Sequence, residues 1–496
     1  MWHSRSASRR LLPAAFLSHL CHHLSEHPLW DDADFTWLSG LVAALCLARY
    51  LDIDITVFEG ASRLAEVGAG IGFLPSKCKS SAKLEIFERL AEEEEDTTFI
   101  CRMSDQDGGH HFEYHTSERC LQFQTHRVGS ETVLVARLKK VDRDNVTSLL
   151  DEPCSRAPDS SSLPHNPLSS TNFLNAPFPY AFAFPFRPRS SYDHPISLRF
   201  EDVTVATCDV LIDANGLQSR ACVVMMERMV SEAVGQADET GQADVDALAA
   251  AAQPVWSGFV AYRVLISAGK KLRERAPQHS LLSNPMLYFG KNACIVGYSI
   301  QNGACLNVIF FTFDPTQEHG VHPGEWMRKA AKADWWAPSR AMVDVNGALR
   351  WAVHTTKPPG LPTFVHGRTA RLGDAAHSKT PFQGSGAGQA VEDAWLLAHL
   401  LGDPTVTRDT IPEALRVYDA ARRHVAQDVQ ERSRVNGHLL ALNYRGIDCD
   451  ALQGEAERAA LIQLGEQMQR DWEWAWSTST DGMVHDSLEA LRKAVL

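Results

Sequence analysis

The sequence predicts an α/β fold in which a nucleotide-binding parallel sheet is assembled from two separated parts of the chain. Three observations support this prediction. A helix, a turn and a β-branched strand follow one another over 40–59, many short alternating strands fill 255–351, and a glycine-dense segment at 369–401 leads into further helices. The first and third segments predict one covered sheet, and the second predicts an antiparallel sheet beside it.

Composition excludes several classes of function. The 496 residues carry a net charge of −13, from 48 basic and 61 acidic side chains, and no basic stripe is interleaved with aromatic residues. A nucleic-acid partner is therefore not expected. The eleven cysteines form no CxxC pair and their number is odd, which argues against a disulfide framework and against a zinc site. We expect a cytoplasmic protein with reduced thiols and no metal ion.

The N-terminal segment 1–34 is atypical, and we predict that it is disordered. Its first 25 residues contain Arg5, Arg9 and Arg10 but no acidic residue, a composition that is also typical of an organelle transit peptide. A wrongly assigned N-terminus is the alternative. No apolar run in the sequence reaches the roughly 18 residues that a membrane-spanning helix needs, so no integral membrane association is expected.

The first ordered element is a degenerate nucleotide-binding unit. Apolar residues recur at helical spacing over 41–48, and the strand "DITVFE" then ends at Glu59, where an acidic side chain would hold a ribose hydroxyl. The spacing of the dinucleotide fingerprint places its three glycines at 35, 37 and 40, but Phe35 and Trp37 occupy the first two positions. Only Gly40 remains, so the phosphate-binding loop is incomplete.

The next region contains a long irregular insertion and then a buried strand. Segment 151–195 is rich in proline, serine and aromatic residues and has no helical or strand period. In 208–214, "CDVLIDA" is nearly all apolar, as expected of a strand covered on both faces. A misassigned first exon, together with retained non-coding sequence near 128–195, would explain both the incomplete loop and the insertion. Sequencing the 5′ end of the transcript tests this interpretation.

The richest segment is "TARLGDAAHSKTPFQGSGAGQAVEDAWLLAHLL", at 369–401. It runs from a strand end through Asp374 to alternating glycines at 384, 386 and 388, and then into an apolar helix. Glycines let a backbone approach a ligand closely, and the free amides at a helix N-terminus stabilise negative charge. Asp374 is placed to accept hydrogen bonds from ribose or ribityl hydroxyls. The alternative is a glycine-rich connection that caps a buried helix.

This segment closely resembles the flavin-contacting motif of the single-component FAD-dependent aromatic-ring monooxygenases, particularly the salicylate hydroxylase-like enzymes. Other pieces agree in order: the helix before Glu59, "EVGAGIGFLPS" at 66–76, "THR" at 125–127, "CDVLIDANGLQSR" at 208–220, "PVWSGFVAYRVLI" at 254–266 and the tail "MQRDWEWAWS". The resemblance implies a discontinuous Rossmann-like FAD-binding domain, an antiparallel β-sheet substrate domain and C-terminal helices. The implied boundaries are 35–250 and 356–435 for the FAD-binding domain, 251–355 for the substrate domain and 436–496 for the helical region.

The resemblance also implies an activity and a cofactor site. The activity is hydroxylation of a phenolic or aromatic carboxylate, using FAD, O2 and either NADH or NADPH, by a monomer or a homodimer. Glu59 would hold the adenosine ribose, Arg127 and Asp374 would lie near the pyrophosphate and ribityl groups, and the amides of 384–387 would face the flavin pyrimidine edge. The implied cofactor-binding residues are Gly40, Glu59, Arg63, Gly70, Ile71, Arg127, Asn215, Gly373, Asp374, Gly384, Gly386 and Ala387.

No residue can be assigned as the catalytic base, and four candidates stay open. Tyr262 and Arg263 lie on a predicted strand of the substrate wall, where an arginine could attract a carboxylate or the reducing cofactor; a simple edge pair is the alternative. His377 could line the flavin face or be structural, and Pro381 lies in the glycine-dense loop. The alternating tryptophans at 472–476 suit a packed or dimer-facing surface better than ring recognition.

One departure from the family pattern leaves the activity open. The family reads GADG where this chain has Asp213, Ala214, Asn215 and Gly216. Asn215 keeps a hydrogen-bonding side chain but loses the charge, whereas Asp213 adds bulk and negative charge where phosphate would approach. The alternatives to an aromatic hydroxylase are therefore a flavin epoxidase or hydroxylase of a natural product, and a cofactor-deficient relative that acts as a binding partner.

Overall fold

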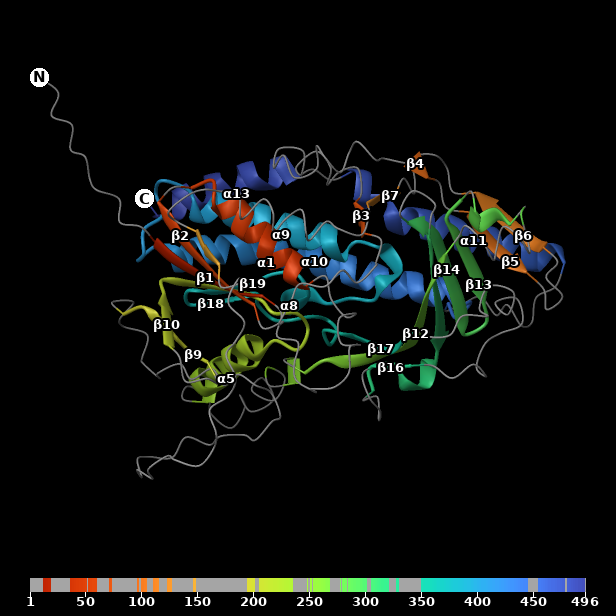
Figure 1. Cartoon of the computed structure of the whole chain (residues 1–496), viewed down its shortest axis with the longest axis horizontal. Coiled ribbons are helices and arrows are strands. Elements are labelled where there is room, and N and C mark those ends of the chain that lie inside the picture. The colour runs from red at the N-terminus through yellow and green to blue at the C-terminus, as the bar shows by residue number, and fades with distance from the viewer. Residues whose placement is uncertain are drawn as a thin grey trace, which may run out of the picture.

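The computed structural model places two sheets at opposite ends of the molecule, with long helices between them (Figure 1). Apart from single residues between 248 and 282, it describes 12–18, 36–50, 52–59, 71–73, 96–97, 100–104, 110–115, 123–126, 146–148, 194–200, 205–234, 253–267, 284–300, 305–320, 327–329, 349–444, 454–477 and 480–495. The predicted insertion at 151–195 lies outside these residues, except for 194 and 195.

The first sheet is mostly parallel and combines strands from distant parts of the chain. Its strand order is β18-β19-β11-β1-β2-β8, and only the pair β18–β19 is antiparallel. The strands are β1 (Leu12–Ser18), β2 (Ile53–Glu59), β8 (Val146–Ser148), β11 (Val210–Ala214), β18 (Val365–His366) and β19 (Thr369–Arg371). Strand β11 is buried along its whole length, as predicted from its apolar sequence.

Strand β1 corrects the prediction for the N-terminal segment. We expected 1–34 to be disordered, but Leu12–Ser18 pairs in parallel with β2 on one side and β11 on the other. The apolar sequence LPAAFLS suits this inner position better than the basic composition around it suggested. Residues 19–35 separate β1 from helix α1 (Thr36–Leu47), whereas a fingerprint loop is only a few residues long. Trp37 lies inside α1, and Gly40 is buried there.

Helices cover the parallel sheet and share one core with it. Helix α1 packs against α9 (Gly386–Leu401), and α9 also packs against α10 (Ile411–Leu440) and α13 (Thr480–Val495). In Figure 1, α1 runs alongside α9 and lies next to β1 and β2. Helices α1 and α9 are apolar nearly all round, which is why both are buried on every side. Among the described residues, no helix is both long and apolar enough to cross a membrane.

The second sheet has the antiparallel strands that the sequence predicted between 255 and 351. Its order is β16-β17-β12-β15-β14-β13-β5-β6. The strands are β12 (Val255–Ser267), β13 (Met286–Gly290), β14 (Ala293–Ile300), β15 (Cys305–Phe313), β16 (Met327–Lys329) and β17 (Leu349–Thr355), with β5 (Ile100–Ser104) and β6 (His110–His115) added at one edge. The sequence did not indicate these last two strands. Strand β5 joins parallel to β13.

The remaining elements connect or cover the two sheets. Helix α5 (Arg220–Val234) follows β11, and the C-terminal helices α11 (Glu455–Trp472) and α12 (Trp474–Ser477) pack against the second sheet. Two small sheets complete the fold. They contain β3 (Ile71–Phe73), β4 (Asp96–Thr97) and β7 (Phe123–His126) in one, and β9 (Ile196–Arg199) and β10 (Val205–Cys208) in the other.

Candidate active site

The carboxylate of Asp213, near the end of β11, points into the protein, where the family pattern has a glycine. Both carboxylate oxygens lie within 2.8 Å of Ser219 Oγ, and Oδ1 also accepts from the amide of Asn215 at 3.2 Å. Gly216, with φ of 74°, then turns the chain toward α5. Asp213 therefore holds the turn together and does not project from it, which argues that its charge does not repel a bound phosphate.

Burial makes Asp213 a pH-dependent element of the fold. It raises the pKa of this carboxyl to about 6, although Ser219 and Arg371 oppose the shift. The neutral form therefore stabilises the folded state fully below the unfolded pKa near 3.8, and this stability is lost as pH rises through about 6.

We expect Asp213→Asn to raise Tm more at pH 8 than at pH 5, because it removes a buried charge that costs about 3 kcal/mol at the higher pH. Thermal unfolding of both proteins at the two pH values measures this difference. The exposed substitution Asp486→Asn changes the formal charge equally and is the control. Equal shifts for Asp213→Asn at pH 5 and pH 8 would contradict the assignment.

Asn215 and Ser385 present buried polar groups that have no partner among the described residues. Both side-chain atoms of Asn215 and the hydroxyl of Ser385 lack a hydrogen bond, although each residue is only 4% exposed. A buried polar group left unpaired costs about 1–3 kcal/mol, so such groups normally indicate a missing partner. Ser385 is the N-cap of α9 but does not cap its amides, and a Cβ added at Gly386 would enter open space. The start of α9 is thus open to an anionic or hydrogen-bonding ligand.

The loop between β19 and α9 begins where α1 approaches it closely. Gly373 has φ of 60°, and a Cβ there would lie 2.9 Å from Ser39 Oγ, so only glycine fits. This approach brings Gly40, next to Ser39, to the same place as Gly373 and Asp374. The two separated segments that the sequence predicted to share one site therefore meet in the fold.

A buried ionic network holds this loop from below. Arg422 on α10 donates to Asp393 Oδ1 at 2.7 Å, to Glu392 Oε2 at 2.8 Å and to Gln389 Oε1 at 2.8 Å. Asp393 Oδ2 in turn accepts from the amide of Gly373 at 2.9 Å. Burial opposes the charge on Asp393, but His377 and the Arg422 guanidinium hold the pKa of its carboxyl below the usual range. The network fixes both the start of the loop and the first turns of α9.

His377 belongs to this network and does not face a ligand. Its ring is fully buried, and Nε2 lies 2.5 Å from Asp393 Oδ2 while Nδ1 lies 3.1 Å from Lys379 Nζ. Burial lowers the pKa of His377, so the ring is neutral and donates from Nε2. The structural alternative for this candidate is therefore the better interpretation.

Strand β12 carries the two substrate-wall candidates on opposite faces. Successive strand residues alternate, so Arg263 lies on the same side as Phe259, and Tyr262 on the other. The ring of Phe382, from the loop before α9, packs on Phe259 at 4.6 Å and on Phe311 at 4.8 Å between centroids. The face with Arg263 is therefore the one that meets the glycine-dense loop. Tyr262 instead accepts from Arg350 Nε at 3.2 Å on the outer face.

Arg263 is oriented by two residues that the sequence did not reveal. Its Nε donates to Asn307 Oδ1 at 3.1 Å, and Asn307 Nδ2 donates to Tyr298 Oη at 2.8 Å. The only signal in the sequence was a polar residue inside the apolar strand CLNVIFFTF. Burial raises the pKa of Tyr298 against the pull of the Arg263 guanidinium, so the phenol stays protonated at neutral pH. The sheet thus presents the cation of Arg263 and the phenol of Tyr298 on either side of Asn307.

Comparisons with known proteins agree with this geometry. Residues 309–433 match the model of a family described as FAD binding domain. Salicylate hydroxylase of Pseudomonas putida is 28% identical over 477 residues, covering 91% of this chain and 92% of that protein. The FAD-dependent monooxygenase str9 of Strobilurus tenacellus is 26% identical over 497 residues, covering 92% and 96%. A solved structure, a salicylate hydroxylase substrate complex, superposes with a TM-score of 0.69 at 20% identity over 97% of this chain and 98% of that one.

The chain is similar to FAD-dependent monooxygenases over nine-tenths of its length, and its residues 309–433 match an FAD binding domain. The described residues fit FAD. Ser385 has an unpartnered hydroxyl at the open N-terminus of α9, whose amides favour negative charge, and Asn215 has an unpartnered amide just after β11. The expected site residues Gly373, Asp374, Gly384, Gly386 and Ala387 all lie between β19 and the first turn of α9.

The candidate residues in the loop before α9 are of two kinds, exposed and held in place by the C-terminal helices. Pro381 and Gly384 are exposed, whereas Phe382 and Gln383 between them are buried. Gln383 donates to the carbonyl of Asp471 at 2.9 Å and accepts from Trp474 Nε1 at 3.1 Å. The tryptophan-rich tail therefore clamps the loop, and Trp472 is buried in the adjoining core, as the packed-surface interpretation expected.

The remaining predicted cofactor residues lie at the edge of the described part of the chain or outside it. Glu59 ends β2 and Ile71 begins β3, and the structure describes their backbone only. Arg63, Gly70 and Arg127 lie outside the described residues.

Proposed function

We propose that this protein is an FAD-dependent monooxygenase that hydroxylates a phenolic or aromatic carboxylate of the salicylate type, using FAD, O2 and NADH or NADPH. One observation supports this substrate class most directly: the buried cation Arg263 lies on the same sheet face as Phe259, the face that meets the glycine-dense loop. The name of the Pseudomonas putida relative points to the same class of substrate. The substrate would lie between this face of β12 and the loop at 381–385.

The residues of the second sheet would bind and orient the ring. A guanidinium forms paired, charge-assisted hydrogen bonds with a carboxylate, and Asn307 fixes the plane of Arg263 for this purpose. Phe259, Phe311 and Phe382 make an apolar wall beside it, which excludes water from the ring. Tyr298, protonated at neutral pH, offers a hydroxyl at the phenol end of such a substrate.

The cofactor would be held by the first sheet and the start of α9. Asn215 would hydrogen-bond FAD after β11, Asp374 would accept from its ribityl hydroxyls, and the amides of 384–387 would face the flavin ring edge. When bound, FAD supplies the transfer of electrons from NAD(P)H to O2. We propose that 35–250 and 356–435 form this cofactor domain, that 251–355 forms the substrate domain, and that 436–496 forms the helical region.

The test is to titrate the purified chain with FAD and then to measure NADH and NADPH oxidation. We expect bound-flavin absorption near about 375 and 450 nm, and oxidation that salicylate stimulates. Absence of flavin binding would support the cofactor-deficient alternative. Stimulation only by non-aromatic compounds would support a natural-product hydroxylase or epoxidase instead.

Asn215 provides a readout that does not depend on turnover. We expect Asn215→Leu to raise Tm without FAD, because it removes a buried unpaired amide, and to weaken FAD binding by about tenfold. Asn215→Asp, which restores the family carboxylate, is the control and is expected to keep FAD binding. A variant with unchanged FAD affinity would remove Asn215 from the cofactor site.

A further inference from the structure

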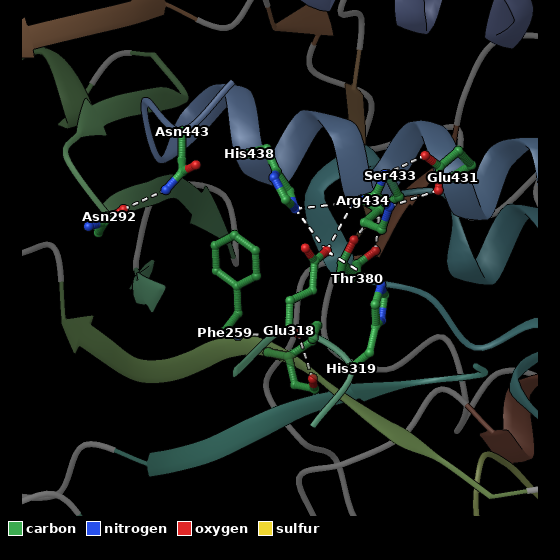
Figure 2. Close-up of polar contacts among 12 residues, drawn as sticks. Phe259, Asn292, Glu318, His319, Thr380, Glu431, Ser433, Arg434, His438 and Asn443 are labelled. Atoms are coloured by element: carbon green, nitrogen blue, oxygen red, sulfur yellow. Dashed lines mark hydrogen bonds and ion pairs between the residues drawn. The ribbon is translucent and has the colours of Figure 1, made fainter. Parts of the chain in front are cut away.

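A separate cavity of about 370 Å³ lies between the second sheet and α10. Its wall comes from the start of β12, the turn after β15, the end of β17 with the loop beyond it, and one face of α10. Figure 2 shows Glu318 reaching from the turn after β15 toward His438 and Arg434 on α10. Its polar lining includes Ser257, Glu318, Thr380, Gln427, Gln430 and Arg434.

This cavity is distinct from the candidate active site. Ser257 at its edge is six residues from Arg263 along β12, on the order of 20 Å in an extended strand. Between them Phe259 stacks on Phe313 with centroids 4.2 Å apart, and Phe382 packs on Phe259. None of these rings lines the cavity, so a ligand in the cavity would not touch the aromatic wall of the substrate site.

The hydrogen-bond donors of the cavity wall are directed into the protein. Arg434 donates to both oxygens of Glu431 and, at 3.0 Å, to Glu318 Oε1. The neutral side chains do the same: Ser257 donates to the carbonyl of Val353, Thr380 to Ser433 Oγ, Gln427 to the carbonyl of Leu361 and Gln430 to the carbonyl of Thr356. A ligand would therefore find few donors on this wall.

The cavity wall does offer hydrogen-bond acceptors to a ligand. Gln430 is 8% exposed, and its Oε1 has no partner among the described residues. The ion pairs of Glu318 with Arg434, His438 and His319 all involve Oε1, which leaves Oε2 for another donor within the described part of the chain. Burial opposes the charge on Glu318, but His438 and Arg434 hold the pKa of its carboxyl at about 2, so it is an anion at any physiological pH.

One residue that lines the cavity has a strained backbone, which suits a binding role. His319 lines the cavity with φ of 66°, in the left-handed region that residues with a side chain rarely adopt. Such strain persists where the surrounding structure enforces it, often at ligand sites. Here it keeps the preceding Glu318 turned toward α10.

We propose that this cavity is a second ligand site that binds a small organic cation through a primary ammonium group. The ammonium donates to Glu318 Oε2 and Gln430 Oε1, and the apolar part of the ligand lies against Pro358 and Pro359. An ammonium supplies three donors and no acceptor, which matches a wall that offers acceptors and negative charge. The site requires neither FAD nor an aromatic substrate.

The test uses the full chain and n-butylammonium chloride, with 1-butanol as the uncharged molecule of the same shape. Calorimetric titration at constant ionic strength is expected to show that butylammonium binds at least about tenfold more tightly than butanol. Butanol binding as tightly as butylammonium, or no binding of butylammonium at millimolar concentrations, would overturn the proposal.

Variants assign the binding to this cavity. We expect Glu318→Gln to weaken butylammonium binding about tenfold or more, and Glu413→Gln, which alters a glutamate paired with Arg416 elsewhere on α10, to leave it unchanged. Gln430→Met keeps the length of the side chain and removes its acceptor, so it decides the question if Glu318→Gln fails to fold. Wild-type affinity in Gln430→Met, or in folded Glu318→Gln, would overturn the proposal.

Discussion

Replacing Arg422 by methionine is expected to lower the free energy of unfolding by about 3–5 kcal/mol, because two buried carboxylates would lose their cation. Arg422 and Asp393 are fully buried, and Glu392 is 4% exposed. Methionine fills much of the same space but can neutralise neither charge. Urea unfolding at pH 7, followed by circular dichroism, measures the change.

A matched substitution on the same helix shows how much of the lost stability depends on the ion pair being buried. Arg432 pairs with Asp428 at 2.7 Å, but both side chains are substantially exposed. We expect Arg432→Met to cost no more than about 1 kcal/mol, since water and salt screen the pair. Similar small losses for both variants would show that the buried network contributes little to stability. A large loss for Arg422→Met is expected to lower FAD affinity as well, because Asp393 also holds the amide of Gly373.

The glycine-dense loop was predictable because its signal is local. Glycines, a strand end and a helix start occur within 369–401, and the fold places Gly373 against α1 as the two-part prediction required. The supporting network was not predictable, because Arg422 lies on another helix, 29 residues beyond Asp393 in sequence. Acidic residues inside an otherwise apolar helix were the only sign that a buried cation was needed.

Strand β1 and the partners of Arg263 were missed for two different reasons. In β1, the basic N-terminal composition outweighed a short apolar run, although only pairing with β2 and β11 decides its place. For Arg263, period-two alternation separates it from Tyr262, but the sequence alone does not say which face meets the loop. That choice depends on Phe382 packing against Phe259 and Phe311, contacts that join residues far apart in the chain.

Arg263→Met is expected to lower kcat/KM for salicylate about 100-fold in the FAD-loaded protein, provided that the proposed function holds. A charge-assisted pair with a carboxylate accounts for about 2–3 kcal/mol, and leaving that carboxylate unpaired in a buried site adds to the loss. The effect should be much smaller for a phenol that lacks the carboxylate. Arg263→Lys should fall between, because an ammonium keeps the charge but not the paired geometry.

Tyr262→Phe is the matched control for this prediction, since Tyr262 is the neighbouring residue on the opposite face of β12. Steady-state NAD(P)H oxidation measures both variants, and bound FAD and Tm measured beforehand exclude a folding defect. If Arg263→Met loses equal activity on salicylate and on the simple phenol, the arginine does not read the carboxylate. A large loss in Tyr262→Phe would mean that the substrate lies against the outer face, and the site between β12 and the glycine-dense loop would then be wrong.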